Sequence, residues 1–196
     1  IGTAFGMVCA RREMLVGFLS EPALLMVFVT ASLICGSTLL PTIVDTLAHR
    51  EFAIYPSLAF AGVAFTMVLL AENARVPIDN PATHLELTMI HEAMVLEYSA
   101  RHLALIEWGS ALKLMNFMAI GLALFVPWGL TAAASGPRGL AVGIVTTALK
   151  LGVTGAALAL IETASAKLRI FRAPEFLATA FLFAVLGLLV HQLLGS

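Results

Sequence analysis

Five uninterrupted apolar stretches constrain this sequence more than any other feature. They cover residues 22–40, 53–71, 114–134, 139–161 and 176–194, and the only Asp, Glu, Lys, Arg or His side chains within them are Lys150 and His191. About 20 apolar residues in a helix cross the roughly 30 Å hydrocarbon core of a bilayer. Each stretch is continuously apolar without alternation, so its length favours a helix over a strand. The sequence therefore predicts an all-α polytopic membrane protein with about five transmembrane helices.

The composition supports a membrane protein and excludes several other classes. Apolar residues make up 60% of the chain and charged residues 12%, and a soluble domain usually has about twice that charged fraction. The net charge of −1 argues against a nucleic-acid partner, which requires a basic face. Cys9 and Cys35 lie far apart, so neither a disulfide framework nor a metal site is expected. We expect residues 1–196 to form one membrane domain. Because the sequence begins Ile1-Gly2-Thr3, we also expect a truncated N-terminus.

The distribution of Lys and Arg predicts the orientation in the membrane. The cytoplasmic connections of a membrane protein are enriched in these residues. One set of connections holds eight of them: Arg11, Arg12, Arg75, Arg101, Lys113, Lys167, Arg169 and Arg172. The other set holds two, Arg50 and Arg138. We therefore expect the N-terminus, the connection at residues 72–107 and the connection at residues 167–172 to be cytoplasmic, with the C-terminus outside.

The connection at residues 72–107 is too long and too charged to be a simple turn. It contains six of the twelve acidic residues: Glu72, Asp79, Glu86, Glu92, Glu97 and Glu107. Asn80 and Pro81 are typical of a helix N-cap and first turn. On a helical wheel the stretch that follows is polar on two sides, with apolar strips between them, whereas a helix lying on lipid has one polar side. This pattern favours contact with another protein on one side and a polar interior on the other.

Two other interpretations of this connection stay open. It could be a solvated charged loop without a specific contact. His84 and His91 share one face of the expected helix and suggest a metal, but no third ligand is placed to complete a site. No metal site is therefore expected on this chain.

Ionisable residues within or beside the apolar stretches are candidates for function, because burying a charge in a bilayer costs roughly 2.5–3.5 kcal/mol on insertion scales. Lys150 is the clearest case, and it needs a partner on another helix or in a polar cavity. Glu21 and Glu162 lie near helix ends, where side chains can also reach the membrane surface. We hypothesise that one polar path runs from the charged connection into the membrane. Its candidate residues are Glu21, Glu86, Glu97, Glu107, Lys150 and Glu162.

Two motifs carry a resemblance to known membrane subunits. The segment at residues 72–81, E-N-A-R-V-P-I-D-N-P, with the later Glu97-Tyr98-Ser99, resembles the signature of subunit 1 (the H-type subunit) of respiratory complex I. The longer run at residues 71–92 is more similar to the membrane anchor of energy-converting NiFe hydrogenases of the formate hydrogenlyase and hydrogenase-4 type. Residues 11–14, 21–23 and 166–175 also fit that branch.

The resemblance implies a non-catalytic docking subunit in a bacterial or archaeal cell membrane. In such complexes a hydrogenase large subunit and an iron–sulfur subunit form a soluble arm, which carries the NiFe centre and the iron–sulfur clusters. Antiporter-like membrane subunits lie beside the anchor, and the redox reaction drives proton or sodium translocation. No cofactor is expected on this chain itself. From their charge and the two-sided polarity of the expected helix, we predict that the connections at 72–107 and 167–172 hold the arm, through Glu72, Arg75, Asp79, Glu92, Arg101, Lys167, Arg169 and Arg172.

The alternative is subunit 1 of a quinone-reducing NADH dehydrogenase. Complex I has several acidic residues after the second proline of its signature, whereas Ala82-Thr83-His84-Leu85 follow Pro81 here. The stretch from Glu86 to Glu97 is also three residues longer than expected of complex I. Both differences favour the hydrogenase branch. A stand-alone transporter is disfavoured, because the sequence shows no inverted repeat.

Overall fold

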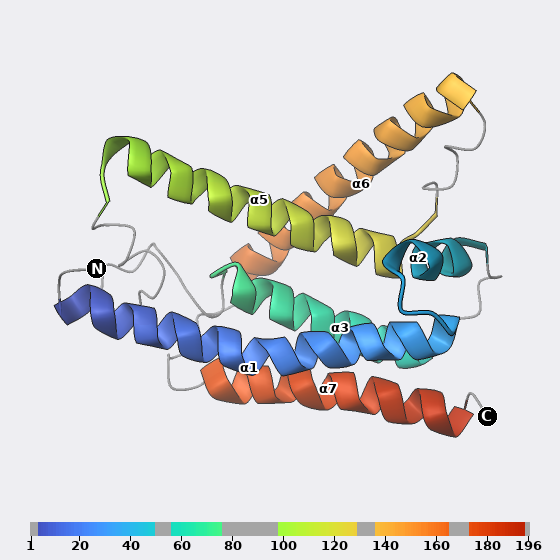
Figure 1. Ribbon diagram of the computed structural model, residues 1–196, viewed down its shortest axis with the longest axis horizontal. Coiled ribbons are helices and arrows are strands. Elements are labelled where there is room, and N and C mark those ends of the chain that lie inside the picture. The colour runs from blue at the N-terminus through green and yellow to red at the C-terminus, as the bar shows by residue number, and fades with distance from the viewer. Residues whose placement is uncertain (1–3, 50–55, 76–97, 129–135, 165–172, 195–196) are drawn as a thin grey trace.

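The computed structural model describes residues 4–49, 56–75, 98–128, 136–164 and 173–194 (Figure 1). These residues fold into α-helices and contain no strand. The helices are α1 (Ala4–Cys35), α2 (Leu40–His49), α3 (Pro56–Glu72), α5 (Ala100–Phe125), α6 (Gly136–Ala164) and α7 (Ala173–Leu194). The all-α fold class predicted from the sequence is confirmed.

Four helices are long and apolar enough to cross a bilayer. They are Ala10–Cys35 within α1, Ala100–Phe125, Ala141–Ala164 within α6, and Ala173–Leu194. The helix α3 is equally apolar but has 17 residues, which corresponds to about 25 Å at 1.5 Å per residue. Each of the five apolar stretches therefore coincides largely with one apolar helix, as expected for a polytopic membrane protein.

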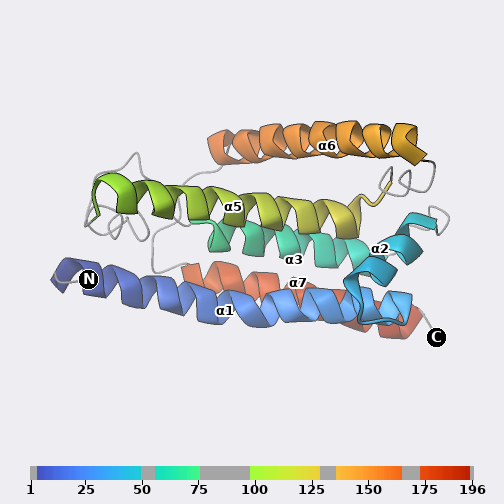
Figure 2. The ribbon, with the colours of Figure 1, turned by 45° about the horizontal axis from the view of Figure 1, so that its top comes forward.

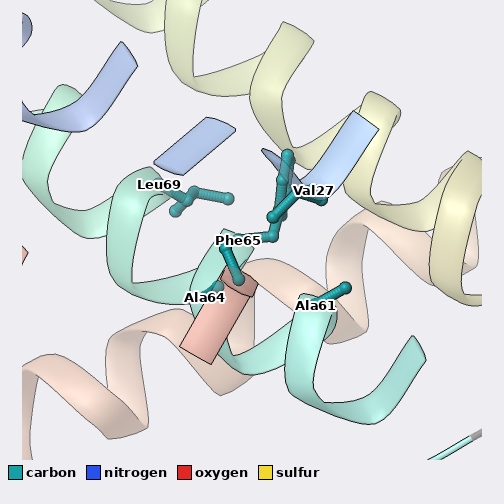
Figure 3. Packing of buried hydrophobic residues seen from close by; sticks show 6 residues of the cluster. Val27, Ala61, Ala64, Phe65 and Leu69 are labelled. Atoms are coloured by element: carbon teal, nitrogen blue, oxygen red, sulfur yellow. The ribbon is translucent and has the colours of Figure 1, made fainter. Parts of the chain in front are cut away.

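The helices α1, α3 and α7 pack together as the core of the bundle, α5 packs against α3, and α6 lies outside α5 (Figure 2). Val27 of α1 meets Ala61, Ala64, Phe65 and Leu69 of α3 in one buried cluster (Figure 3). The Phe65 ring also packs against two α5 rings, with centroid distances of 6.2 Å and 5.6 Å. Small residues at these contacts allow the close backbone approach by which membrane helices associate.

The helix directions place five helix ends at one end of the bundle. These are the N-termini of α1, α5 and α7 and the C-termini of α3 and α6 (Figures 1 and 2). This arrangement agrees with the relative sidedness predicted from Lys and Arg, because the connections rich in these residues leave from this end. The N-terminal parts of α1 and α5 extend beyond the ends of α3, α6 and α7 (Figure 2). The assignment of this end to the cytoplasm stays a prediction.

Two helix boundaries differ from the sequence prediction. Pro22 lies inside α1 instead of in the first turn of a helix. A proline removes one backbone donor, which a membrane helix tolerates when neighbouring groups satisfy the freed carbonyl. The helix α5 begins at Ala100, 14 residues before the expected stretch, and ends at Phe125 instead of residue 134. Pro127 explains this end, because a proline disfavours helical backbone at the residue before it.

Two further features were predicted wrongly or missed. Gly136 and Pro137 lie between the apolar stretches 114–134 and 139–161, where a glycine and a proline favour a turn, but they begin α6. Proline is well tolerated there, because its missing N–H would have no helical partner in the first turn. The helix α2 was not predicted. It is amphipathic, with Ile43 and Leu47 buried against α1 and α5, and it is too short to stand out among the longer apolar stretches.

Candidate functional site

A carboxylate at the end of α3 is the centre of a charged group between the apolar helices. The Lys113 ammonium on α5 donates to Glu72 Oε2 at 2.8 Å and to the Glu72 carbonyl at 2.7 Å. The hydroxyl of Ser20 on α1 donates to Glu72 Oε1, and Ser20 is buried. The Glu72 side chain is 17% exposed and the Lys113 side chain 45%. Both carboxylate oxygens of Glu72 therefore have a donor, each supplied by a different helix.

The backbone at the end of α3 directs the next cation towards another helix. Ala74 has a positive φ of 49°, the Ala74 N–H donates to the Ala71 carbonyl, and the Arg75 N–H donates to the Leu70 carbonyl. This bonding pattern is a Schellman motif, in which glycine is the usual left-handed residue. The turn places the Arg75 guanidinium 3.4 Å from Glu162 Oε1 on α6. The Arg75 and Glu162 side chains are 42% and 26% exposed.

We call Ser20, Glu72, Arg75, Lys113 and Glu162 the Glu72 cluster. It joins α1, α3, α5 and α6, and its two carboxylates are matched by two cations. Glu162 Oε1 is buried and accepts no hydrogen bond from the described residues, although the Arg75 cation is close. Charges between apolar membrane helices are usually paired with one another. The cluster therefore holds two ion pairs between apolar helices at one end of the bundle.

Lys150 lies apart from the Glu72 cluster. It lies 12 residues before Glu162 on α6, which corresponds to about 18 Å along the helix. Its ammonium donates to the Val126 carbonyl at 2.7 Å and to the Trp128 carbonyl, both just beyond the end of α5. Lys150 therefore has partners at the end of another helix, and the described residues do not connect it directly with Glu162.

The other candidate residues divide into two groups. Glu21 is exposed on α1, and Arg101 and Glu107 are exposed on α5 instead of lying in a loop. The second group lies outside the described residues and consists of Asp79, Glu86, Glu92, Glu97, Lys167, Arg169 and Arg172. The helix expected near Asn80, with His84 and His91, also lies outside the described residues. Within the described residues, no three His, Cys, Asp or Glu side chains come together as a metal site would require.

Sequence reasoning did not identify two members of the Glu72 cluster as site residues. Lys113 was assigned only to a connection, although it is the one charged residue between Glu107 and Arg138 and is followed by 21 uncharged apolar-stretch residues. That position was a signal that Lys113 lies within a helix. Ser20 gave no signal, because a single serine beside Glu21 has many possible roles. Its contact depends on how α1 packs against α3.

Two kinds of sequence comparison relate this chain to known proteins. Residues 2–192 match the family model described as NADH dehydrogenase. The chain is 30% identical to formate hydrogenlyase subunit 4 of Escherichia coli (strain K12), over 95% of this chain and 59% of that protein. It is 34% identical to hydrogenase-4 component C of the same organism, over 65% of this chain and 39% of that protein. The chain thus spans little more than half the length of the first relative.

The family match covers nearly all of the chain, and the four long apolar helices have the character of a membrane subunit. Both relatives are named as components of hydrogenase systems. The chain is therefore a membrane protein that belongs to the NADH dehydrogenase family and is homologous to formate hydrogenlyase subunit 4 and hydrogenase-4 component C.

Proposed function

We propose that this chain is the membrane anchor of an energy-converting hydrogenase of the formate hydrogenlyase type. It docks a soluble arm, formed by a hydrogenase large subunit and an iron–sulfur subunit, and helps couple the redox reaction to proton or sodium translocation. The observation that carries the proposal is the Glu72 cluster, which lies at the end of the bundle from which both expected docking segments leave. The names of the two relatives support the hydrogenase branch of the family.

The shape and charge of this end of the bundle support the docking role. The helices α1 and α5 extend past the other helices there, so a partner can contact them without entering the lipid (Figure 2). Arg101 and Glu107 are exposed on the extension of α5, beside the exposed Trp108. Exposed charges beside large apolar side chains are typical of a protein interface. The cofactors of the complex, a NiFe centre and iron–sulfur clusters, belong to the arm in this proposal, and antiporter-like subunits complete the membrane part.

The coupling role follows from the pairing of charges within the cluster. Arg75 leaves α3 towards the docking end, and Glu162 is on a membrane helix. A movement of Arg75 on redox change in the arm would leave the Glu162 carboxylate without its cation. That carboxylate would then be an unpaired charge among apolar helices, which is costly. The Arg75–Glu162 pair therefore offers one step between the arm and a membrane ion path.

Reversing the charge of Arg75 tests the docking role. R75E should release the hydrogenase subunits while this chain remains in the membrane, because it removes a cation from the docking end. The double variant R75E/E162R restores an intrachain ion pair with opposite polarity and should still lack the arm. The reversal D45K, on α2 at the other end of the bundle, is the matched control and should retain it. Co-purification gives the answer, and an arm retained at wild-type levels by R75E/E162R would refute docking through Arg75.

The coupling role is tested by neutralising Glu162. E162Q should assemble the complex and keep hydrogenase activity with a soluble electron donor, but lose most ion pumping in sealed vesicles. The control E175Q removes an exposed carboxylate from the first turn of α7 and should pump normally. Failure of E162Q to assemble would indicate that the pair only holds α3 and α6 together. Wild-type pumping by E162Q would eliminate this residue from the path.

The family description favours one alternative function. Residues 2–192 match the NADH dehydrogenase model, so subunit 1 of a quinone-reducing complex I remains the second candidate. The two functions predict different partners and different activities of the purified complex. NADH:quinone reductase activity, and its inhibition by quinone-site inhibitors, is expected only for complex I. Hydrogen evolution is expected only for the hydrogenase.

A further inference from the structure

The helix α5 ends inside an apolar stretch instead of at its boundary. The apolar sequence continues to Ala134, yet α5 stops at Phe125, and Val126 has non-helical backbone angles of φ −135° and ψ 59°. Pro127 causes the break, because it disfavours helical backbone at Val126 and lacks an N–H of its own. Carbonyl groups at and beyond the end of α5 therefore lose their helical donors in an apolar environment.

An unpaired carbonyl within a bilayer is costly, because no water is present to replace the lost donor. The C-terminal end of a helix also carries about half a negative charge, so a cation is the most effective partner there. Lys150 supplies one. Its ammonium donates at 2.7 Å to Val126 and also donates to Trp128, so a single group satisfies two carbonyls on either side of Pro127.

The position of Lys150 in α6 prevents its ammonium from reaching the membrane surface, as lysines near the ends of membrane helices do. Lys150 is the midpoint of α6, with 14 residues before it and 14 after it in the helix. Each end of α6 is therefore about 21 Å away, which is farther than a lysine side chain can extend to reach the membrane surface. The neighbouring Leu149 is 68% exposed on the outer side, whereas Lys150 is directed to the end of α5.

We propose that Lys150 is a positioning residue, a cation tethered to α6 that occupies the negative end of the broken helix α5. Broken membrane helices commonly bind a free monovalent cation at such an end. Here the ammonium takes that place, fixes the break of α5 and holds α6 against it. This role is independent of the proposed hydrogenase function, and it assigns Lys150 to the end of α5 instead of to the path that contains Glu162.

Infrared spectroscopy with a labelled carbonyl tests this assignment. The chain has two tryptophans, so W108F leaves Trp128 as the only site for carbonyl-¹³C tryptophan. A charge-assisted hydrogen bond lowers the stretching frequency of the carbonyl that accepts it. K150M in the W108F protein, in lipid bilayers, should therefore shift the labelled band to higher frequency. K150R should keep the band near its original position, because a guanidinium also donates to two acceptors.

The control L149M changes the adjacent outward residue and should leave the band in place. A K150M band that stays at the wild-type frequency would overturn the proposal, as would a K150R band at the K150M frequency. A second measurement needs no change at position 150. In the W108F protein, dipolar coupling between ¹⁵Nζ-lysine and the Trp128 carbonyl should be strong in solid-state NMR, and its absence would also overturn the proposal.

Discussion

Replacing Lys113 by Met should lower the free energy of unfolding by about 2 kcal/mol, because it leaves the Glu72 carboxylate without its cation in an apolar bundle. Breaking a fully buried pair costs about 3–5 kcal/mol, and an exposed pair contributes about 1 kcal/mol or less. Glu72 is 17% exposed and Lys113 is 45% exposed, so the expected loss lies between these limits. Unfolding in lipid or mixed micelles, followed by loss of helical signal, measures it.

A double-mutant cycle separates this pairing from other effects of the substitution. E72Q/K113M should be more stable than the sum of the two single losses predicts, by about 1–2 kcal/mol, because neither charge remains unpaired. R101M removes an exposed cation from the same helix and should change stability by less than about 0.5 kcal/mol. Additive losses in the cycle would mean that Glu72 and Lys113 do not depend on each other.

Gly187→Leu should disrupt the contact between α7 and α3 and cost about 3 kcal/mol, the upper part of the range for overpacked cores. A Cβ added at Gly187 would lie 2.9 Å from the Ser57 carbonyl oxygen and 3.4 Å from the Ala61 nitrogen. Both are backbone atoms, which cannot rotate away as the end of a side chain can. The two helices would therefore have to separate. Phe60 and Phe183, stacked at 6.3 Å between the same helices, would lose their contact as well.

Gly152→Leu is the matched control for this prediction. A Cβ at Gly152 on α6 meets nothing within 4 Å among the described residues. Both substitutions gain the same helix propensity, so the difference between them reports the close contact alone. The unfolding measurement used for Lys113 applies here, and equal stability of the two variants would contradict the packing of α7 on α3.

The sequence predicted the helices well because continuous apolar length is a local property. It predicted their ends less well. Pro22 looked like a helix start but lies within α1, where neighbouring helices determine whether a proline is tolerated. Pro127, in contrast, ends α5. The sequence alone does not show which of these two prolines a helix continues through. The amphipathic α2 was missed, since its buried residues Ile43 and Leu47 depend on contacts with α1 and α5.

The candidate site was only partly predictable for a related reason. Lys150 and Glu162 were identified because a charge within or beside an apolar stretch is costly. Their partners come from other helices, as Arg75 does for Glu162, and the sequence gives no distance between helices. The docking and path residues at positions 76–97 and 165–172 lie outside the described residues, so their roles stay predictions.

The central claim is that this membrane subunit anchors a hydrogenase arm. The most direct measurement is purification of the complex from native membranes through a tag on this chain, followed by identification of every subunit by mass spectrometry. We expect a hydrogenase large subunit, an iron–sulfur subunit and antiporter-like membrane subunits. Recovery of an NADH-oxidising, quinone-reducing set of subunits, or of this chain without soluble partners, would contradict the claim.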